Sequence, residues 1–288
     1  MVSNLVVALL TGSAVVFAAM AQGLADSSGS ALLVIGERRS RQPPDTRHPF
    51  GYAREAFFWG LLSAVTMLVI GAGLSAWRGY QQFAYPEPLD MPALAMAVVV
   101  LSIATNAYAI RLSVRKLCIE HGSLRGAFRA MDQPLVKGAL LRDAIGTFTS
   151  LVGLLALLLY QAFGYVFFDA FGALAASLMM AGASLVLMAQ VRALITGRAL
   201  PRAVTRQLRK TVLNTPGVVR VKQRAAVYAG TSEVLVDADL DLAEDLDTGQ
   251  IEALLDLLER RIRRDLPDTE IVRVKLDSPS PAGARKYV

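Results

Sequence analysis

The strongest constraint on this chain is the gathering of its apolar residues into long, nearly uncharged runs before residue 200. A helix needs about 20 apolar residues to cross the hydrocarbon core of a bilayer. Five runs reach that length and a short one precedes them, in the order Asn4–Leu10 (the short run), Ser13–Gly36, Phe57–Trp77, Met91–Ile110, Leu135–Phe163 and Val166–Ile195. The last third of the chain is charged and patterned like a soluble domain. We therefore expect a transmembrane domain over residues 1–200 and a soluble domain over 201–288, with 278–288 as a disordered tail.

The first run is too short to be a span by itself. A helix over Met1–Leu10 would be only about 15 Å long, which is half of a hydrocarbon core. Either the sequence starts inside a longer helix, or this segment is re-entrant or missing as a span. We favour the first alternative and expect an α-helical polytopic domain of the six-helix type with a truncated first helix.

Positive charges lie in alternate loops between the apolar runs, which predicts the orientation of the domain. The loop after the second run contains Arg38, Arg39, Arg41, Arg47 and Arg54, and the loop after the fourth contains Arg111, Arg115, Lys116, Arg125 and Arg129. The intervening loops are poor in positive charge. Lys and Arg concentrate on the cytoplasmic side of membrane proteins. We therefore expect a multi-pass plasma-membrane protein whose basic loops and C-terminal domain face the cytoplasm.

Charge and cysteine content limit the function classes. A net charge of +6 would suggest nucleic acid as the partner of a soluble protein, but here membrane topology accounts for the arginines, so we expect no nucleic-acid partner. The single cysteine, Cys118, excludes an intrachain disulfide and a metal site built from cysteines. The sequence has no nucleophile paired with a base, no phosphate-binding loop and no cofactor fingerprint. We therefore expect neither an enzyme nor a tightly bound cofactor.

The soluble part has the pattern of a small α+β domain. The expected elements follow one another as a helix, two strands, a helix and a strand, at Pro201–Leu213, Val218–Tyr228, Glu233–Leu242, from Asp247 onward, and Ile271–Leu276. Asp247 and Gln250 have the spacing of a helix capping box. This order predicts a small open sheet with helices packed on one face. The alternating Asp237, Asp239 and Asp241 are expected on the solvated face, facing Arg273 and Lys275 across the sheet.

Two carboxylates fall within the apolar runs and are the candidates for function. An ionised side chain at mid-membrane costs about 3 kcal/mol on insertion scales, so its presence there indicates a functional site. Asp26 lies in the middle of the second run, with Gln22 one helical turn earlier on the same face. Asp143 lies in the fifth run, with Ala139 one turn before it and Thr147 one turn after it. Two helices that each present a carboxylate could replace the water shell of a divalent cation and neutralise its charge.

Structural roles for the same residues remain open. Asp26 could hydrogen-bond to Ser27, Ser28 or a neighbouring helix, and Asp143 could pair with Arg142 or Lys137. The structural explanation is less favoured for the pair than for either residue alone, because both lie at similar depth on separate helices. Asn106 in the fourth run could line a pathway, although hydrogen bonding between helices is the commoner use of such a residue.

Several motifs resemble the cation diffusion facilitators, which are divalent-metal efflux transporters. The stretch L-T-G-S-A-V-V-F-A-A-M-A-Q-G-L-A-D (Leu10–Asp26) is similar to the entry of the family's second helix, and D-T-R-H-P-F-G-Y-A-R-E (Asp45–Glu55) to its D-x-x-H-P-F-G-[HY]-x-R-x-E loop. L-L-R-D-A (Leu140–Ala144) matches the metal motif of the fifth helix at its Asp, F-D-A-F-G-A-L-A-A-S is similar to a sixth-helix motif, and P-G-V-V-R-V (Pro216–Val221) to the start of the family's ferredoxin-like cytoplasmic domain. The resemblance covers nearly the whole chain.

The resemblance implies a tetrahedral metal site with two ligands from the second helix and two from the fifth. Asp26 and Asp143 stand at two of these positions, but Gln22 replaces a His or Asp and Ala139 supplies no ligand. The site would then offer only oxygens, from two carboxylates and an amide, with Thr147 or a water in addition. Oxygen ligands suit manganese or magnesium better than zinc. The missing His would also have been the natural proton carrier near neutral pH.

A second, weaker metal site is suggested in the loop by Asp45 and His48, where some family members bind another cation. The position of a further His is occupied by Tyr52 here. A lone His in a basic loop is more often structural. The chain's other histidine, His121, has no partner pattern, so the cytoplasmic domain lacks the His-based sites of some relatives.

The leading hypothesis is an efflux transporter for a divalent cation such as Mn²⁺, Zn²⁺ or Fe²⁺. The resemblance implies a homodimer and proton antiport. One alternative is a non-transporting relative that serves as a membrane scaffold or regulatory partner and has lost ligands, as Gln22, Ala139 and Tyr52 would suggest. The other is a metal sensor that works through the C-terminal domain, which the lack of His and Cys there disfavours.

Overall fold

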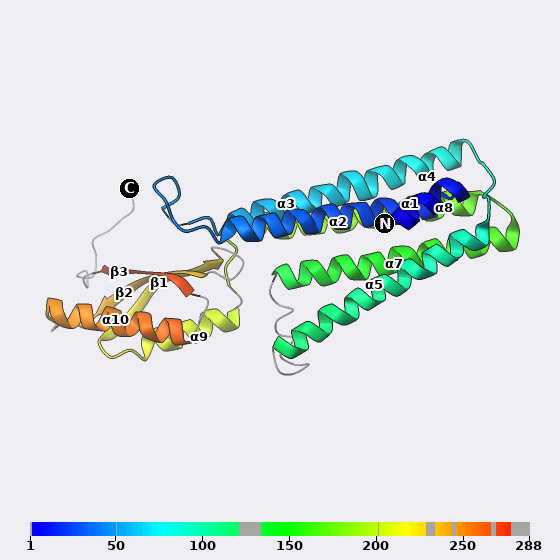
Figure 1. Ribbon diagram of the computed structural model, residues 1–288. Coiled ribbons are helices and arrows are strands. Elements are labelled where there is room, and N and C mark those ends of the chain that lie inside the picture. Colours follow the sequence, from blue (N-terminus) through cyan, green and yellow to red (C-terminus); the bar gives the residue numbers. More distant parts are fainter. Residues whose placement is uncertain are drawn as a thin grey trace, which may run out of the picture. The chain divides into compact units, whose positions relative to one another are not determined.

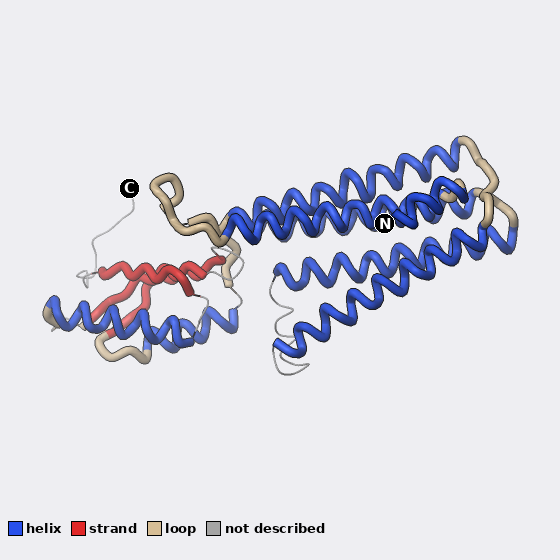
Figure 2. Tube along the Cα trace, in the orientation of Figure 1, coloured by secondary structure: helices blue, strands red, loops and turns tan. Residues whose placement is uncertain are grey.

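The computed structural model in Figure 1 describes residues 2–49, 51–120, 134–200, 202–228, 234–243, 246–265 and 269–277. It divides into two compact units, one of Met1–Arg38 with Phe58–Arg192 and the other of Arg39–Phe57 with Ala193–Val288. The first unit is built from helices, whereas the described strands lie in the second (Figure 2). The expected tail, 278–288, and His121 lie outside the described residues.

The helices of the first unit follow the apolar runs of the sequence. They are α1 (Val2–Thr11), α2 (Ala14–Ser40), α3 (Glu55–Thr66), the π-helical η1 (Met67–Gly73), α4 (Leu74–Ala84), α5 (Pro92–Glu120), α7 (Pro134–Phe163) and α8 (Phe167–Ile195). Four helices among the described residues are long and apolar enough to cross a membrane, namely Glu55–Ala84, Pro92–Arg115, Asp143–Phe163 and Phe167–Ile195. The chain is therefore a multi-pass membrane protein.

The second expected span, α2, is not among these four. It is 27 residues long, which exceeds the length that a span needs. Its mean hydropathy is lowered by Gln22, Asp26 and the serines that follow them. The helix that is least apolar is therefore the one that carries two of the three candidate ligands in the membrane.

Small residues let α2, η1 and α8 approach one another closely. Ala14, Ala18, Ala64, Ala173 and Ala176 belong to one buried cluster of this unit. A Cβ added at Gly71, within η1, would lie 3.4 Å from the Ala25 Cβ and 3.3 Å from the Met180 Sδ. Close approach through small side chains is typical of helix packing in membranes. The π-helical turn thus lies against α2 directly beside Asp26.

A buried carboxylate from α8 caps the start of α2. The chain breaks between α1 and α2 at Gly12, where φ is +66°. Asp169 is fully buried and accepts hydrogen bonds from the Ser13 hydroxyl (2.6 Å) and from the backbone N–H groups of Ala14 (2.7 Å) and Val15 (3.2 Å). The first N–H groups of a helix have no partner within the helix and carry partial positive charge. Asp169 therefore fixes where α2 begins.

The second unit contains a three-stranded sheet in the order β1 (Val218–Tyr228), β2 (Val234–Leu242) and β3 (Thr269–Asp277). The β1–β2 pair is antiparallel and the β2–β3 pair is parallel. Helices α9 (Arg202–Leu213) and α10 (Thr248–Asp265) lie on one face of the sheet (Figure 1). The observed order agrees with the order expected from the sequence, and each expected element is present within a few residues of its predicted bounds.

Details of this unit also agree with the sequence pattern. The capping box forms, because the Gln250 N–H donates to the Asp247 carboxylate (2.7 Å) and the Asp247 N–H donates to the Gln250 amide oxygen (3.0 Å). Buried Val236, Ala238 and Leu240 of β2 pack with residues of both helices. The register places Asp237 opposite Arg273 and Asp239 opposite Lys275, as expected, although the side chains of Asp237, Arg273 and Lys275 lie outside the description. The expected solvation of this face is not found at Asp239 and Asp241, which are half-buried.

Candidate metal site

The candidate ligands of α2 lie on one side of that helix. Gln22 is buried, with 7% of its surface exposed, and Asp26 is half-buried. The four-residue spacing brings their Cβ atoms to within about 6 Å of each other on one helix face. Because backbone N–H groups inside a helix are already bonded to carbonyls, a carboxylate there finds its partners in side chains, water or a ligand.

Asp143 is placed by the pairing of α7 with α5. Its carboxylate accepts a hydrogen bond from the Ser113 hydroxyl of α5 at 3.3 Å. Thr147, one turn later, donates to the backbone carbonyl of Asp143 at 3.1 Å, so its hydroxyl hydrogen is committed to its own helix. The structural alternative for Asp143 concerned Arg142 and Lys137, whose side chains lie outside the described part.

One hydrogen bond sets the register between the two ligand-bearing helices. The Thr149 hydroxyl of α7 donates to the Gln22 amide oxygen of α2 at 2.9 Å. The two helices run in opposite directions (Figure 1), so Asp26 and Asp143 lie on the same side of this contact. The helical rise places Asp26 about 6 Å and Asp143 about 9 Å from it. The two carboxylates are therefore at nearly the same depth on different helices.

A neutral polar cluster surrounds this contact. A Cβ at Gly146 would lie 2.7 Å from the Gln22 amide nitrogen and 3.2 Å from that of Asn106. The Asn106 amide donates to the Ser150 hydroxyl at 3.5 Å, and Ser150 donates to the Gly146 carbonyl at 2.9 Å. Three helices, α2, α5 and α7, thus meet at one glycine. Asn106 forms the interhelical hydrogen bond that was the commoner of its two expected uses.

The carboxylates do not form a complete set of metal ligands by themselves. Within the described ranges, no group of three or more His, Cys, Asp or Glu side chains could hold a metal ion. By its residue type Ala139 has no donor atom, and Gln22 supplies an amide. A cation here would take its ligands from Asp26, Asp143, Gln22 and water.

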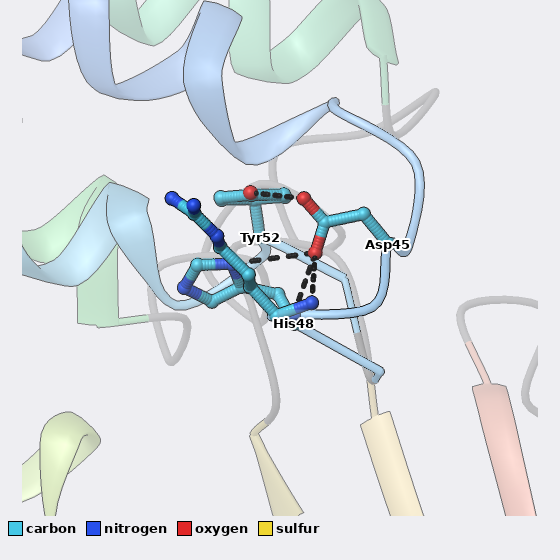
Figure 3. A network of polar contacts seen from close by, with 4 residues as sticks. Asp45, His48 and Tyr52 are labelled. Atoms are coloured by element: carbon cyan, nitrogen blue, oxygen red, sulfur yellow. Dashed lines mark hydrogen bonds and ion pairs between the residues drawn. The ribbon is translucent and has the colours of Figure 1, made fainter.

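The weaker site, in the loop between α2 and α3, is internally bonded (Figure 3). The Asp45 carboxylate accepts hydrogen bonds from the Tyr52 hydroxyl (2.7 Å) and from the backbone N–H groups of Arg47 (2.8 Å) and His48 (2.6 Å). The His48 Nδ1 lies 3.5 Å from the same carboxylate. The His48 ring lies tilted against the Tyr52 ring, with their centroids 4.1 Å apart. Asp45 and His48 are brought together as predicted, but their contacts are those of a loop that holds its own shape.

The electrostatics of this loop agree with a structural role. The Tyr52 hydroxyl and the His48 N–H stabilise the carboxylate form of Asp45 and hold its pKa below the ordinary range. The same bond to Asp45 raises the pKa of Tyr52. A cation bound to Asp45 would have to compete with these donors, and Tyr52 stands where a third, nitrogen ligand would be needed.

Sequence reasoning missed Asp169, Thr149 and Ser113. In the sequence, Asp169 stands out only as the Asp of the F-D-A-F-G motif, because it lies near the start of an apolar run and not in its middle. A signal was available, since the Thr11–Ser13 break leaves the first N–H groups of α2 in need of an acceptor. Thr149 and Ser113 gave no such signal, because a hydroxyl in a transmembrane helix commonly bonds its own backbone.

Comparison with known proteins identifies the family. The family model described as "Cation efflux transmembrane domain" matches residues 1–195, which is more than half of the chain. The chain belongs to the cation efflux family. The resemblance to cation diffusion facilitators is therefore confirmed. Because the family's named relatives are transporters, the expectation that the chain is not an enzyme is confirmed as well.

Individual relatives of this cation efflux protein are distant. The human "Proton-coupled zinc antiporter SLC30A9, mitochondrial" is 23% identical over 237 residues, 81% of this chain and 42% of the relative. The chain thus spans less than half of that protein. The Yersinia enterocolitica "Cation-efflux pump FieF" is 23% identical over 263 residues, 91% of this chain and 83% of the relative. The solved structure "MamM CTD - Copper form" has a TM-score of 0.25 and 17% identity, covering 29% of this chain and 91% of that domain.

Proposed function

We propose that this cation efflux protein exports a divalent metal cation through the first unit, with Asp26 and Asp143 as the charged ligands and Gln22 as an auxiliary ligand. The observation that carries the proposal is the placement of two carboxylates at nearly the same depth on the antiparallel helices α2 and α7. Charged groups within membrane spans are costly and mark ion pathways. Two carboxylates balance the charge of one divalent cation.

The ligand chemistry favours a cation that accepts oxygen. Two carboxylates, an amide and water form a hard ligand set, which suits Mn²⁺ or Mg²⁺ better than Zn²⁺. The human relative, by its name, carries zinc, so Zn²⁺ stays in the set to be tested. Release of the cation requires its ligands to bind something else, and protonation of Asp26 or Asp143 would both weaken the site and couple export to a proton gradient.

The remaining features of the proposal come from the family resemblance. A homodimer, a six-helix membrane domain, a ferredoxin-like C-terminal domain on the cytoplasmic side and a plasma-membrane location form one consistent arrangement with the basic loops. The human relative is named as mitochondrial, so the location requires its own test. Fluorescence microscopy of the tagged chain in its native cell, and crosslinking in native membranes, address the location and the dimer.

Flux measurements test the transport function. Proteoliposomes that contain the purified chain are loaded with an indicator and exposed to Mn²⁺, Fe²⁺, Zn²⁺ or Co²⁺. We expect the wild-type chain to transport at least one of these cations, and the Asp26→Ala, Asp143→Ala double variant to transport none. Glu87→Ala, which removes an exposed loop carboxylate, is the matched control and should transport normally. Flux that survives the double variant would overturn the ligand assignment, and no flux of any cation from a folded chain would favour the scaffold alternative.

A further inference from the structure

The contact between Gln22 and Thr149 bears on how a cation would be held and released. Gln22 is an auxiliary ligand only if its amide oxygen can reach the cation. That oxygen accepts a hydrogen bond from the Thr149 hydroxyl at 2.9 Å. Both residues are buried, with 7% and 3% of their surfaces exposed, so bulk water does not readily replace this bond. The same oxygen is therefore the acceptor of the Thr149 hydroxyl and the proposed ligand of the cation.

Thr149 has alternative acceptors on its own helix. Its hydroxyl lies 3.0 Å from the Ile145 carbonyl oxygen and 3.0 Å from the Gly146 carbonyl oxygen. The hydroxyl can therefore turn back to its own helix when Gln22 leaves, and no buried donor is left without an acceptor. A buried polar group that loses its only partner would cost about 1–3 kcal/mol. The two carbonyl acceptors remove that cost, so the Thr149 hydroxyl can exchange the Gln22 oxygen for a carbonyl of its own helix and back.

The amide lies closely against α7. Its nitrogen faces the bare surface of Gly146, where a Cβ would lie only 2.7 Å away. Gln22 and Thr149 also line a small pocket together with Ala18, Ala19 and Ser150, among others. Glycine at 146 is thus what allows the Gln22 side chain to lie against α7.

We propose that Thr149 is a positioning residue that competes with the transported cation for the Gln22 amide oxygen. Bound to Thr149, Gln22 ties α2 to α7. Bound to a cation at Asp26 and Asp143, Gln22 completes the ligand set while Thr149 bonds to its own helix. The competition weakens binding and aids release, which a transporter needs because a cation that is held too tightly does not leave. This inference rests on the proposed function.

Metal binding to the full-length chain tests the competition separately from flux. Isothermal titration of the purified protein with Mn²⁺ and with Zn²⁺ gives the dissociation constant. In Thr149→Val, which keeps the shape but removes the hydroxyl, we expect binding about three- to tenfold tighter, the worth of one neutral hydrogen bond. In proteoliposomes KM and maximal flux should fall together. Thr149→Ser keeps the hydroxyl and should restore both values. Thr105→Val, at an exposed threonine that also bonds its own helix, is the control.

A double variant shows whether Thr149 acts through Gln22. In a Gln22→Leu background, Thr149→Val should leave the dissociation constant unchanged, since the contested oxygen is gone. Unchanged or weaker metal binding in Thr149→Val alone would overturn the competition. Tighter binding caused by Thr149→Val in the Gln22→Leu background would overturn it as well. These outcomes differ from failure of the proposed function, in which the wild-type chain binds and transports no more metal than the Asp26→Ala, Asp143→Ala variant. Gel filtration of each variant verifies that it is folded.

Discussion

The carboxylate of Asp169 and the carboxylates of Asp26 and Asp143 all belong to the membrane unit, but their surroundings differ. Asp169 meets the start of a helix, where N–H groups lack partners, and accepts three hydrogen bonds while fully buried. Asp26 and Asp143 lie inside helices whose N–H groups are already used, and both are partly exposed. Backbone N–H groups at a helix terminus satisfy a carboxylate, whereas a carboxylate in a helix interior depends on side chains, water or a ligand.

This difference distinguishes a carboxylate that caps a helix from the two that we propose as cation ligands. Asp169 holds α2 in place, so its charge stabilises the fold. Asp26 and Asp143 place charge within the membrane unit, which costs free energy, and we propose that a bound cation offsets that cost. Substitution of the two kinds of residue should therefore have opposite effects on stability, and only one kind should change function while the fold is kept.

The largest expected effect is on flux in Asp26→Asn and Asp143→Asn. Each change keeps the shape of the side chain and removes one charged ligand, so flux should fall at least about 100-fold, the upper end of what loss of an outer-shell partner costs a metal site. Stability should stay the same or rise, because a charge worth about 3 kcal/mol at mid-membrane is removed. Flux assays and thermal unfolding of the same preparations measure both. A loss of stability equal to that of an Asp169 variant would contradict the comparison.

The next effect is on stability, in Asp169→Asn. The amide nitrogen cannot accept the bonds that one carboxylate oxygen accepts, so N–H groups at the start of α2 lose a charged acceptor at a cost of about 3 kcal/mol. The temperature of unfolding in detergent, followed by gel filtration after heating, should fall clearly. Asp90→Asn, at an exposed position, is the matched control. A variant as stable as the wild type would show that the cap is not needed.

The sequence predicted the helices and strands well because their patterns are local. Hydrophobic length located the spans, and alternation located β2 with its buried Val236, Ala238 and Leu240. It also predicted Asp26, Asp143 and Gln22 as one constellation, which stays a prediction. It could not find the cap, because Ser13 and Asp169 are 156 residues apart and the bond depends on how α2 and α8 pack. Thr149 was equally hidden, because only the register of α2 against α7 gives its hydroxyl an acceptor on another helix.

A smaller effect is expected from Gly146→Ala, which tests the neutral cluster beside the two functional carboxylates. The added Cβ would approach the Gln22 nitrogen at 2.7 Å and the Asn106 nitrogen at 3.2 Å, so both amides must shift and α2, α5 and α7 must separate slightly. Overpacking of this kind costs about 1–3 kcal/mol. We expect reduced stability and reduced flux together. Gly182→Ala on α8, where a Cβ meets nothing within 4 Å, should change neither. Normal flux in Gly146→Ala would show that Gln22 need not lie against α7.

The smallest effect is expected at the loop carboxylate, Asp45, which resembles Asp169 in being held by donors of the fold. Its pKa lies below the ordinary range chiefly because the Tyr52 hydroxyl bonds the charged form. The bonds therefore stabilise the loop above the ordinary pKa and are lost as the pH falls through the lowered pKa, below about pH 4. In Tyr52→Phe, carbon-13 NMR of the Asp45 carboxyl group in the full-length chain should show the pKa moving up toward its ordinary value. An unchanged pKa would mean that the Tyr52 hydroxyl does not lower the pKa of Asp45. If micromolar Mn²⁺ shifts the titration of the Asp45 carboxyl group, this residue binds a cation and its role is not purely structural.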